Sequence, residues 1–383
     1  MRSFKLFGTL CAKSFIVALA VLAASGAAMA QSSVTIYGTL DVGYGKLKGG
    51  KLGLQNGETY GLVNAPLTAK DGFNSTSVIG FRGVEDLGGG LQAKFNLQTG
   101  GFDLGGGSTP LAFSRESNVA LAGGFGEVQL GRSSSIAAKA MGGFDLNGTS
   151  GSSALANAGV SAVTWYGSSR RSDQLQYTSP TMGGVTARLG VTLKGDAAAN
   201  GNLTAAQIAD NKDRVTAAVS FANGPLAIAA VVETKNSASA NRDAFAIGAS
   251  YDLGVAKIAA AYNQRENKAA VATGYNQFAA IPGSGYAAGQ GGKGYSLGVV
   301  APVGALNIGA QFANNTDSKV KATELFANYA LSKRTRVYVD YVMTSGTNAV
   351  AAQALAFTSL AAGGSDAVPA KTNALGFGVV HSF

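Results

Sequence analysis

Apolar and polar residues alternate with a period of two along most of this chain. Between Val34 and Tyr44 one phase is apolar and the other is mostly polar, the apolar phase being Val34, Ile36, Leu40, Val42 and Tyr44. The last twelve residues repeat the pattern, because apolar positions alternate with small or polar ones up to an aromatic end at Phe383. Successive side chains of a strand point to opposite faces, so the pattern predicts strands with one apolar and one polar face.

Short and long connections alternate between these strands. Seven are tight reversals, at residues 86–90, 123–126, 179–184, 222–225, 252–254, 302–304 and 331–335. Eight are longer or more polar, among them residues 46–74, 133–171, 264–290 and 345–371. Seven turns and eight loops join about 16 strands, an even number that leaves both chain ends on one side, as a closed antiparallel barrel requires. We therefore predict an all-β transmembrane barrel with short periplasmic turns and long external loops.

The composition favours a membrane barrel over a soluble sandwich. The chain holds 54 glycines and is 46% hydrophobic, yet after Ala30 its apolar residues are spread in alternation and form no run long enough for a membrane helix. A soluble fold of this size needs a packed interior, which the polar phase does not supply. At about 16 strands the lumen is an aqueous channel. An open edge in hydrocarbon is costly, so the first and last strands are expected to pair.

The first thirty residues predict export. Residues 1–30 combine a charged start, an apolar stretch and small residues before Gln31, which is typical of a signal peptide, and residues 31–383 then form the barrel domain. A retained anchor is less favoured, because the apolar stretch is shorter than the roughly 20 residues of a membrane helix. The single cysteine, Cys11, leaves with this segment. The expected location is the outer membrane of a Gram-negative cell.

Six segments resemble a known family. They are SSVTIYGTLDVGY (32–44), GFRGVEDLGGGLQAKFNLQTGGF (80–102), FSRESNVALAGGFGEVQLGR (113–132), LQYTSPTMGGVTARLGV (175–191), YALSKRTRVYVDY (329–341) and GFGVVHSF (376–383). In this order they resemble the general porins of Gram-negative outer membranes, in particular the trimeric kind of β-proteobacteria. The resemblance implies a homotrimer of 16-stranded barrels, each with its own pore narrowed by a third external loop that folds inward. Here that loop would span about residues 133–162.

The constriction can be assigned in part. In related porins an acidic patch on the inward loop faces a basic cluster on the wall, whereas this loop has one carboxylate, Asp145. Strand alternation directs several polar side chains to the lumen, since a charge on the lipid face at mid-membrane costs about 2–4 kcal/mol. These lumen-facing residues are Arg82, Lys94, Arg188, Arg336, Tyr338 and Asp340.

Two further arginines complete the predicted constriction set. By resemblance Arg115 occupies a pore-wall arginine position, and Arg132 directly precedes the inward loop. If Arg115 faces the pore, strict alternation turns Glu116 and Asn118 outward, where a trimer contact could bury them. Relatives often carry an arginine at the position of Val78.

The terminal strand is expected to close the barrel and to be recognised by the barrel assembly machinery through Phe377, Val379, His381 and Phe383. His381 is the only histidine, so a histidine-assisted hydrolase is not expected, and we predict no enzyme activity, no cofactor and no metal. A glycine motif at residues 289–294 fits G-x-G-x-x-G but precedes a strand, not a helix. Lysines and arginines are scattered, so no nucleic acid partner is expected.

The predicted function is passive diffusion of ions and small hydrophilic solutes. The alternatives are a substrate-selective porin, or an adhesin or receptor barrel that acts through its loops. Without the three positive charges of residues 1–30 the formal charge of +9 becomes 9 − 3 = +6, and this positive excess of the mature chain suggests a weak anion preference as a hypothesis. The expected partners are further copies of the chain in a homotrimer, outer-membrane lipid and lipopolysaccharide, the assembly machinery and the diffusing solutes.

Overall fold

The computed structural model describes residues 33–48, 58–62, 74–100, 112–148, 153–163, 169–193, 213–235, 243–265, 293–317, 319–345 and 371–383. Most of them lie in antiparallel strands. The strands are β1 Ser33–Lys48, β2 Glu58–Leu62, β3 Val78–Gly88, β4 Leu91–Gln98, β5 Glu116–Gly123, β6 Gly126–Ser134, β7 Arg170–Thr178, β8 Val185–Thr192, β9 Arg214–Asn223, β10 Leu226–Lys235, β11 Ala244–Asp252, β12 Lys257–Arg265, β13 Gly294–Val303, β14 Leu306–Asn315, β15 Lys321–Ala330, β16 Thr335–Ser345 and β17 Lys371–Ser382.

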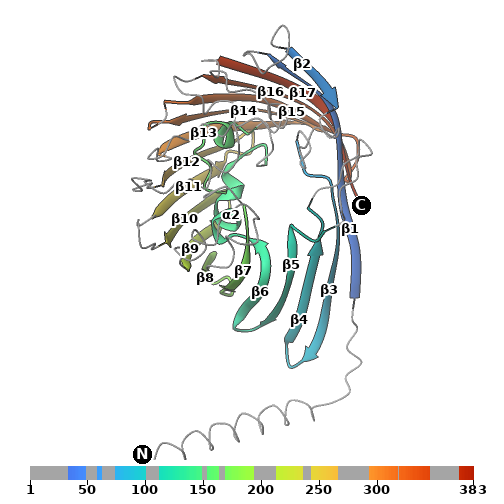
Figure 1. The fold of residues 1–383 in the computed structure, drawn as a ribbon, viewed down its shortest axis with the longest axis vertical. Coiled ribbons are helices and arrows are strands. Elements are labelled where there is room, and N and C mark those ends of the chain that lie inside the picture. Colours follow the sequence, from blue (N-terminus) through green and yellow to red (C-terminus); the bar gives the residue numbers. More distant parts are fainter. Residues whose placement is uncertain are drawn as a thin grey trace, which may run out of the picture.

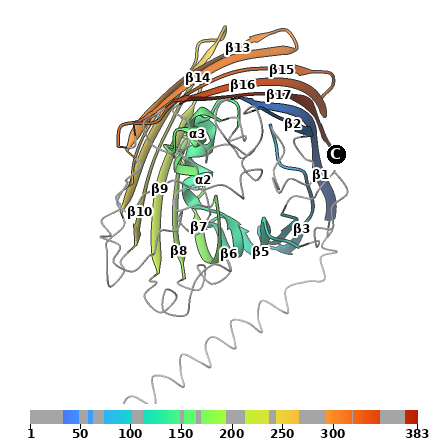
Figure 2. The same cartoon turned by 45° about the horizontal axis from the view of Figure 1, so that its top comes forward.

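Sixteen of these strands form a closed ring. From β3 to β17 each strand pairs antiparallel with the next, and β1 pairs with both β3 and β17. Figures 1 and 2 show the strands enclosing an interior, with β17 beside β1. This confirms the predicted antiparallel barrel of 16 strands. The short β2 is an addition that the sequence did not predict, and it pairs with the end of β1.

All seven tight reversals are found where the alternation predicted them. They join β3 to β4, β5 to β6, β7 to β8, β9 to β10, β11 to β12, β13 to β14 and β15 to β16. Most of these turns contain glycine in the left-handed region; Gly224, with a φ of 57°, and Gly304, with a φ of 63°, are two examples. The other connections start from strand ends at the opposite end of the barrel.

The seam between β1 and β17 is closed by main-chain bonds at the last residue. The Gly38 N–H donates to the Phe383 carbonyl over 3.0 Å, and the Phe383 N–H donates to the Gly38 carbonyl over 3.1 Å. Farther along, the Tyr44 and Phe377 rings stack with centroids 6.0 Å apart. The predicted pairing of first and last strands is therefore confirmed.

The two faces of the wall differ in polarity as the alternation predicted. Apolar side chains point outward, and Val34, Val119 and Leu189 are 66%, 57% and 53% exposed. The inward phase holds polar and small side chains. Among the described residues, no helix has the length and apolar character needed to cross a membrane. The outward apolar positions are thus the surface available to lipid.

Three short helical segments lie inside the ring, where Figures 1 and 2 show α2 and Figure 2 also α3. They are α2 Ile136–Met141, η2 Gly142–Phe144 and α3 Ala154–Asn157. Serine caps begin both α-helices, because Ser135 Oγ accepts from the Ala138 N–H over 3.1 Å and Ser153 Oγ accepts from the Ala156 N–H over 3.2 Å. These segments belong to the connection between β6 and β7, and residues 135–163 are called the inward loop below.

Candidate functional site

One side of the inward loop is apolar and packs on the wall of β9 to β11. Ile136, Met141 and Phe144 are buried against small inward residues such as Ala218 and Ala246. A Cβ added to Gly248 would collide with the Phe144 ring. Likewise, a Cβ at Gly190 would meet Ile136, one at Gly294 would meet Val160, and one at Gly298 would meet Leu146. The wall is therefore built from small residues where the loop approaches it.

The tip of the inward loop is attached to β14, β15 and β16 by buried polar groups. The Asn147 amide donates to Glu324 over 2.7 Å and to Asp340 over 2.9 Å. The Gln311 amide donates to Asp145 over 2.9 Å and to Glu324 over 3.0 Å. The Ala154 N–H donates to Glu324 over 3.0 Å. We call the resulting set the anchor network, made up of Asp41, Asn74, Asp145, Asn147, Gln311, Glu324, Arg336, Tyr338 and Asp340.

The connection after β1 supplies the second part of the anchor network. The Asn74 N–H donates to Asp41 and its side-chain amide donates to Asp340, both over 2.9 Å. Arg336 donates to Asn74 Oδ1 over 2.8 Å, and the Tyr338 hydroxyl donates to Asp41 over 2.8 Å. Asp41, Glu324 and Asp340 are fully buried. The network thus joins three distant parts of the chain under the inward loop.

Asp145 belongs to this network rather than to an exposed acidic patch. Its carboxylate is buried, accepts from Gln311 and also accepts from the Ser153 hydroxyl. It is the single carboxylate of the inward loop. The loop therefore presents no exposed acidic side chain of its own in its described part.

Lys139 is the charged side chain that the inward loop exposes. It extends from α2 toward β6 and β7, where its ammonium donates to Gln129 Oε1 and to Gln176 Oε1, each over 2.7 Å. The surrounding wall removes water from the ammonium and lowers the pKa of Lys139, an effect that Glu116 and Glu127 oppose and Arg188 reinforces. Arg188 lies close by on β8 and donates to Ser220 over 3.1 Å.

Arg82 and Lys94 lie on a different part of the wall, on β3 and β4. The Arg82 guanidinium carbon sits 5.1 Å from the centroid of the Tyr37 ring. Lys94 forms an ion pair with Glu127 over 3.1 Å. Both positions belong to the inward phase. Arg82 is paired with Thr35 on β1 and with Asn96 on β4, and Lys94 lies two residues from Asn96 on the same face of β4.

The expectation that Glu116 and Asn118 turn outward is wrong. β5 begins at Glu116, so Arg115 precedes the strand and its direction does not fix the alternation that follows. Asn118 donates to Glu116 over 2.9 Å and accepts from the inward Gln129 over 2.8 Å. Arg115 Nε donates to Gln98 Oε1 over 3.0 Å, so all three side chains contact inward groups.

Arg132 lies near the end of β6 from which the inward loop departs. Its guanidinium donates to the Ser172 hydroxyl over 2.7 Å and to the Ser114 carbonyl. The structure thus divides the predicted constriction residues into groups. Asp145, Arg336, Tyr338 and Asp340 meet in the anchor network, Arg82 and Lys94 share one wall, Arg188 lies beside Lys139, and Arg115 and Arg132 lie near the loop ends of β4 to β7.

At the seam, the four predicted closure residues follow one another along β17. Phe377 stacks on Tyr44, Val379 is paired with Val42, and His381 Nδ1 lies 2.9 Å from the Thr335 hydroxyl. The main chain of Phe383 bonds to Gly38. Their recognition by the assembly machinery stays a prediction.

Sequence reasoning missed several residues that define this interior. Lys139, Asn74, Asn147, Gln311 and Glu324 were not among the predicted site residues. The alternation of β14 and β15 held a usable signal, because Gln311 and Glu324 are polar residues on the inward phase of their strands. Asn74 and Asn147 lie in long connections, where no periodic pattern indicates direction.

The chain matches the family model described as Gram-negative porin over residues 17–349. It is 31% identical to Outer membrane porin protein 32 of Delftia acidovorans over 386 residues, which cover 97% of this chain and 100% of the relative. It is 30% identical to an outer membrane porin protein of Bordetella pertussis, with coverage of 97% and 100%.

Solved structures agree. The anion-selective porin from Comamonas acidovorans superposes with a TM-score of 0.70 at 25% identity, covering 92% of this chain and 100% of that one. The in-vitro folded OmpT of Vibrio cholerae, in a trimer form, shares the fold with a TM-score of 0.58 at 14% identity, covering 92% of this chain and 99% of that one. The closed barrel, the family match and these relatives lead to one conclusion: the chain belongs to the Gram-negative porins and is an outer-membrane porin that forms a water-filled channel for the diffusion of ions and small hydrophilic solutes.

Proposed function

We propose that this channel prefers anions and that Lys139 on the inward loop is a main source of the preference. The observation that carries the proposal is the contrast within the loop, where the only carboxylate, Asp145, is buried in the anchor network while Lys139 is exposed. Fixed cations beside the path of the solutes concentrate anions and repel cations. The Comamonas acidovorans porin, described as anion-selective, has the same fold and supports the proposal.

The balance of charges around Lys139 also favours anions. Within the described part of the chain, Arg82, Lys139 and Arg188 form no ion pair within 4.0 Å. The two acids that act on Lys139 already face other cations, since Glu127 pairs with Lys94 over 3.1 Å and Glu116 lies 4.0 Å from Arg170. The predicted constriction roles of Arg115, Arg132 and Arg336 remain part of this proposal.

The test is the zero-current potential of single channels across a KCl gradient in a neutral planar bilayer. The wild type is expected to give the sign of a chloride-preferring pore. Lys139→Glu should move the potential toward the potassium side, because it reverses a charge at the inward loop. Lys333→Glu is the matched control, since Lys333 lies in the exposed turn between β15 and β16 and should change little. Equal shifts in both variants, or a potassium-preferring wild type, would sink the proposal.

We also propose that three copies assemble into a homotrimer in contact with outer-membrane lipid and lipopolysaccharide, and that residues 1–30 are a signal peptide removed on export. The trimer form of OmpT, which shares the fold, supports the proposed homotrimer. The outward strands carry large exposed apolar side chains, which either lipid or another copy must cover. Light scattering of the protein extracted in mild detergent should give the mass of three mature chains, and sequencing should start at Gln31. A monomer mass, or a start at Met1, would contradict these proposals.

A further inference from the structure

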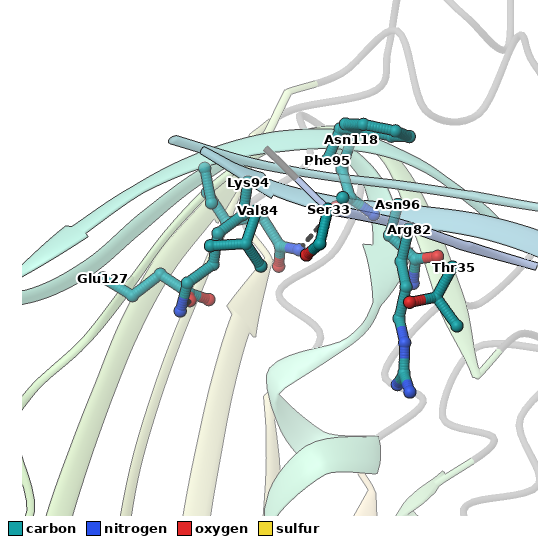
Figure 3. A pocket seen from close by; sticks show the side chains of 12 residues that line it. Ser33, Thr35, Arg82, Val84, Lys94, Phe95, Asn96, Asn118 and Glu127 are labelled. Carbon is teal, nitrogen blue, oxygen red and sulfur yellow. Dashed lines mark hydrogen bonds and ion pairs between the residues drawn. The ribbon is translucent and has the colours of Figure 1, made fainter. Parts of the chain in front are cut away.

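A small cavity lined by both polar and apolar residues lies on the lumen wall near the end of the barrel that carries the short turns. Its volume is about 220 Å³, and β1, β3, β4, β5 and β6 contribute to its lining. Figure 3 shows Arg82 and Thr35 extending from the same side of the sheet into this region. Pockets for drug-sized ligands measure about 300–1,000 Å³, so this cavity is matched to a smaller solute.

Arg82 is the cation of this cavity that stays available to a ligand. Its guanidinium lies over the Tyr37 ring, with 5.1 Å between the guanidinium carbon and the ring centroid. The ring is itself fixed, because the Tyr37 hydroxyl donates to Asn96 over 2.6 Å and accepts from Gln98 over 3.2 Å. Stacking on a fixed ring orients the planar guanidinium while leaving its N–H groups free to donate.

The second cation of the cavity, Lys94, already has an acidic partner. Lys94 pairs with Glu127 over 3.1 Å, which also engages the acid that lines the cavity. Glu127 is the only carboxylate in the lining. In the described part of the chain Arg82 has no carboxylate within 4.0 Å. The free charge of the cavity is therefore positive and is located on Arg82.

Neutral donors surround this charge. Asn96 Oδ1 accepts a hydrogen bond from the Tyr37 hydroxyl. The Asn96 side-chain amide therefore offers a ligand its N–H donors. The Thr35 hydroxyl lies beside Arg82 in the β1 to β3 register, and Ser33 is two residues away on the same face. Val84 and Ala120 add apolar side chains to the lining. This combination fits the carboxylate of a small solute with a short apolar body.

We propose that this cavity is a binding station for small aliphatic carboxylates of roughly two to four carbons, with Arg82 as the bidentate partner of the carboxylate. The inference rests on the proposed anion-preferring channel and adds a site at which an anion pauses before it leaves or after it enters. A guanidinium holds a carboxylate through two parallel N–H donors, a geometry that an ammonium cannot reproduce.

The test uses the trimeric or monomeric protein as extracted, reconstituted as single channels in KCl, with sodium lactate as the probe. Lactate is expected to reduce the open-channel current in a saturable manner. Arg82→Gln should raise the half-saturating concentration about tenfold or more, because it removes a charge-assisted pair of hydrogen bonds. Lys257→Gln is the matched control, since Lys257 lies on the inward phase of β12, at the same end of the barrel and outside the cavity. It should leave the half-saturating concentration unchanged.

Further measurements distinguish a failure of this inference from a failure of the proposed function. Arg82→Lys keeps the charge and should bind lactate more weakly than the wild type; equal binding would overturn the role of the guanidinium. Saturation-transfer NMR on the detergent-solubilised protein detects lactate contacts without conduction and should lose them in Arg82→Gln. Inorganic phosphate that blocks as strongly as lactate would overturn the carboxylate class. A chloride-preferring channel that lactate does not block overturns this inference alone, whereas a potassium-preferring wild type overturns the proposed function first.

Discussion

The two halves of the barrel wall face one lumen but carry different side chains. Strands β9 to β16 present small apolar residues and a buried polar network, and the inward loop covers them. Strands β1 and β3 to β8 present Arg82, Lys94 and Arg188, whose charged ends are not enclosed in this way. Where the inward loop covers the wall, the polar groups of the wall are hydrogen-bonded as in a protein core. Where the wall faces the aqueous lumen, charged side chains stay in contact with water.

This difference encloses four acids of the pore. The anchor network holds Asp41, Asp145, Glu324 and Asp340, all buried and all bonded to amides or hydroxyls. The opposite wall and α2 hold the exposed cations. Because buried acids act through more protein and less directly on a passing ion, the exposed cations are expected to dominate selectivity.

The largest expected effect comes from breaking the anchor network. Asp340→Ala leaves the side-chain amides of Asn74 and Asn147 without their shared acceptor, and each unsatisfied group costs about 1–3 kcal/mol. The free energy of unfolding should fall by about 2–5 kcal/mol. A urea titration in lipid vesicles, with the folded fraction read from gel mobility, measures it. Asp252→Ala is the control, because Asp252 is an exposed carboxylate at the end of β11 that accepts only an exposed turn hydrogen bond from the Gly254 N–H, and an equal loss in both variants would contradict the network.

The apolar attachment of the loop can be broken from the wall side. Gly248→Val places carbon atoms where the Phe144 ring lies, so the loop must move or the wall must strain, at a cost of about 1–3 kcal/mol. Displacement of the loop should raise the single-channel conductance. Gly124→Val is the control, because nothing lies within 4 Å of a Cβ added in that turn. Unchanged conductance and stability in Gly248→Val would show that the loop does not depend on this contact.

A smaller effect is expected at the start of α2. Ser135→Ala removes the side-chain acceptor of the Ala138 N–H and should lower the free energy of unfolding by about 1 kcal/mol. Ser135→Thr should restore most of it. Ser117→Ala removes an exposed outward hydroxyl and serves as the control in the same urea titration. A loss in Ser117→Ala as large as in Ser135→Ala would argue against the cap.

The smallest effect is expected from pH. Since the pKa of Lys139 is lowered, its ammonium loses its proton at a lower pH than an ordinary lysine, and the anion preference should weaken as the pH rises toward the alkaline range. Arginine stays protonated there, so Lys139→Arg should keep its preference over the same range. Permeability ratios recorded from neutral to alkaline pH decide the point, and identical curves for the two proteins would refute it.

The sequence predicted the wall well because the wall is periodic. The alternation of short turns and long loops predicted about sixteen strands and the places of the seven turns, and the apolar alternation assigned Arg82, Arg188 and Asp340 to the inward phase. It failed at Glu116 and Asn118, because a strand that begins at Glu116 does not inherit the direction of Arg115.

The interior could be predicted only in part. The inward loop was expected from the family resemblance, but its contacts depend on non-periodic residues. Asn74 and Asn147 reach the wall from long connections, and their partners are 266 and 193 residues away in the sequence. The direction of Lys139 follows from the way α2 packs through Ile136 and Met141, which is a property of the folded barrel and not of the local pattern.

The most direct test of the account compares Asp145→Asn with Lys139→Gln in the same selectivity measurement. Each variant removes one charge from the inward loop while keeping a polar side chain at the position. The account predicts that the chloride-to-potassium permeability ratio falls in Lys139→Gln and changes little in Asp145→Asn, because Asp145 is enclosed in the anchor network. A ratio that rises strongly in Asp145→Asn and stays constant in Lys139→Gln would contradict it.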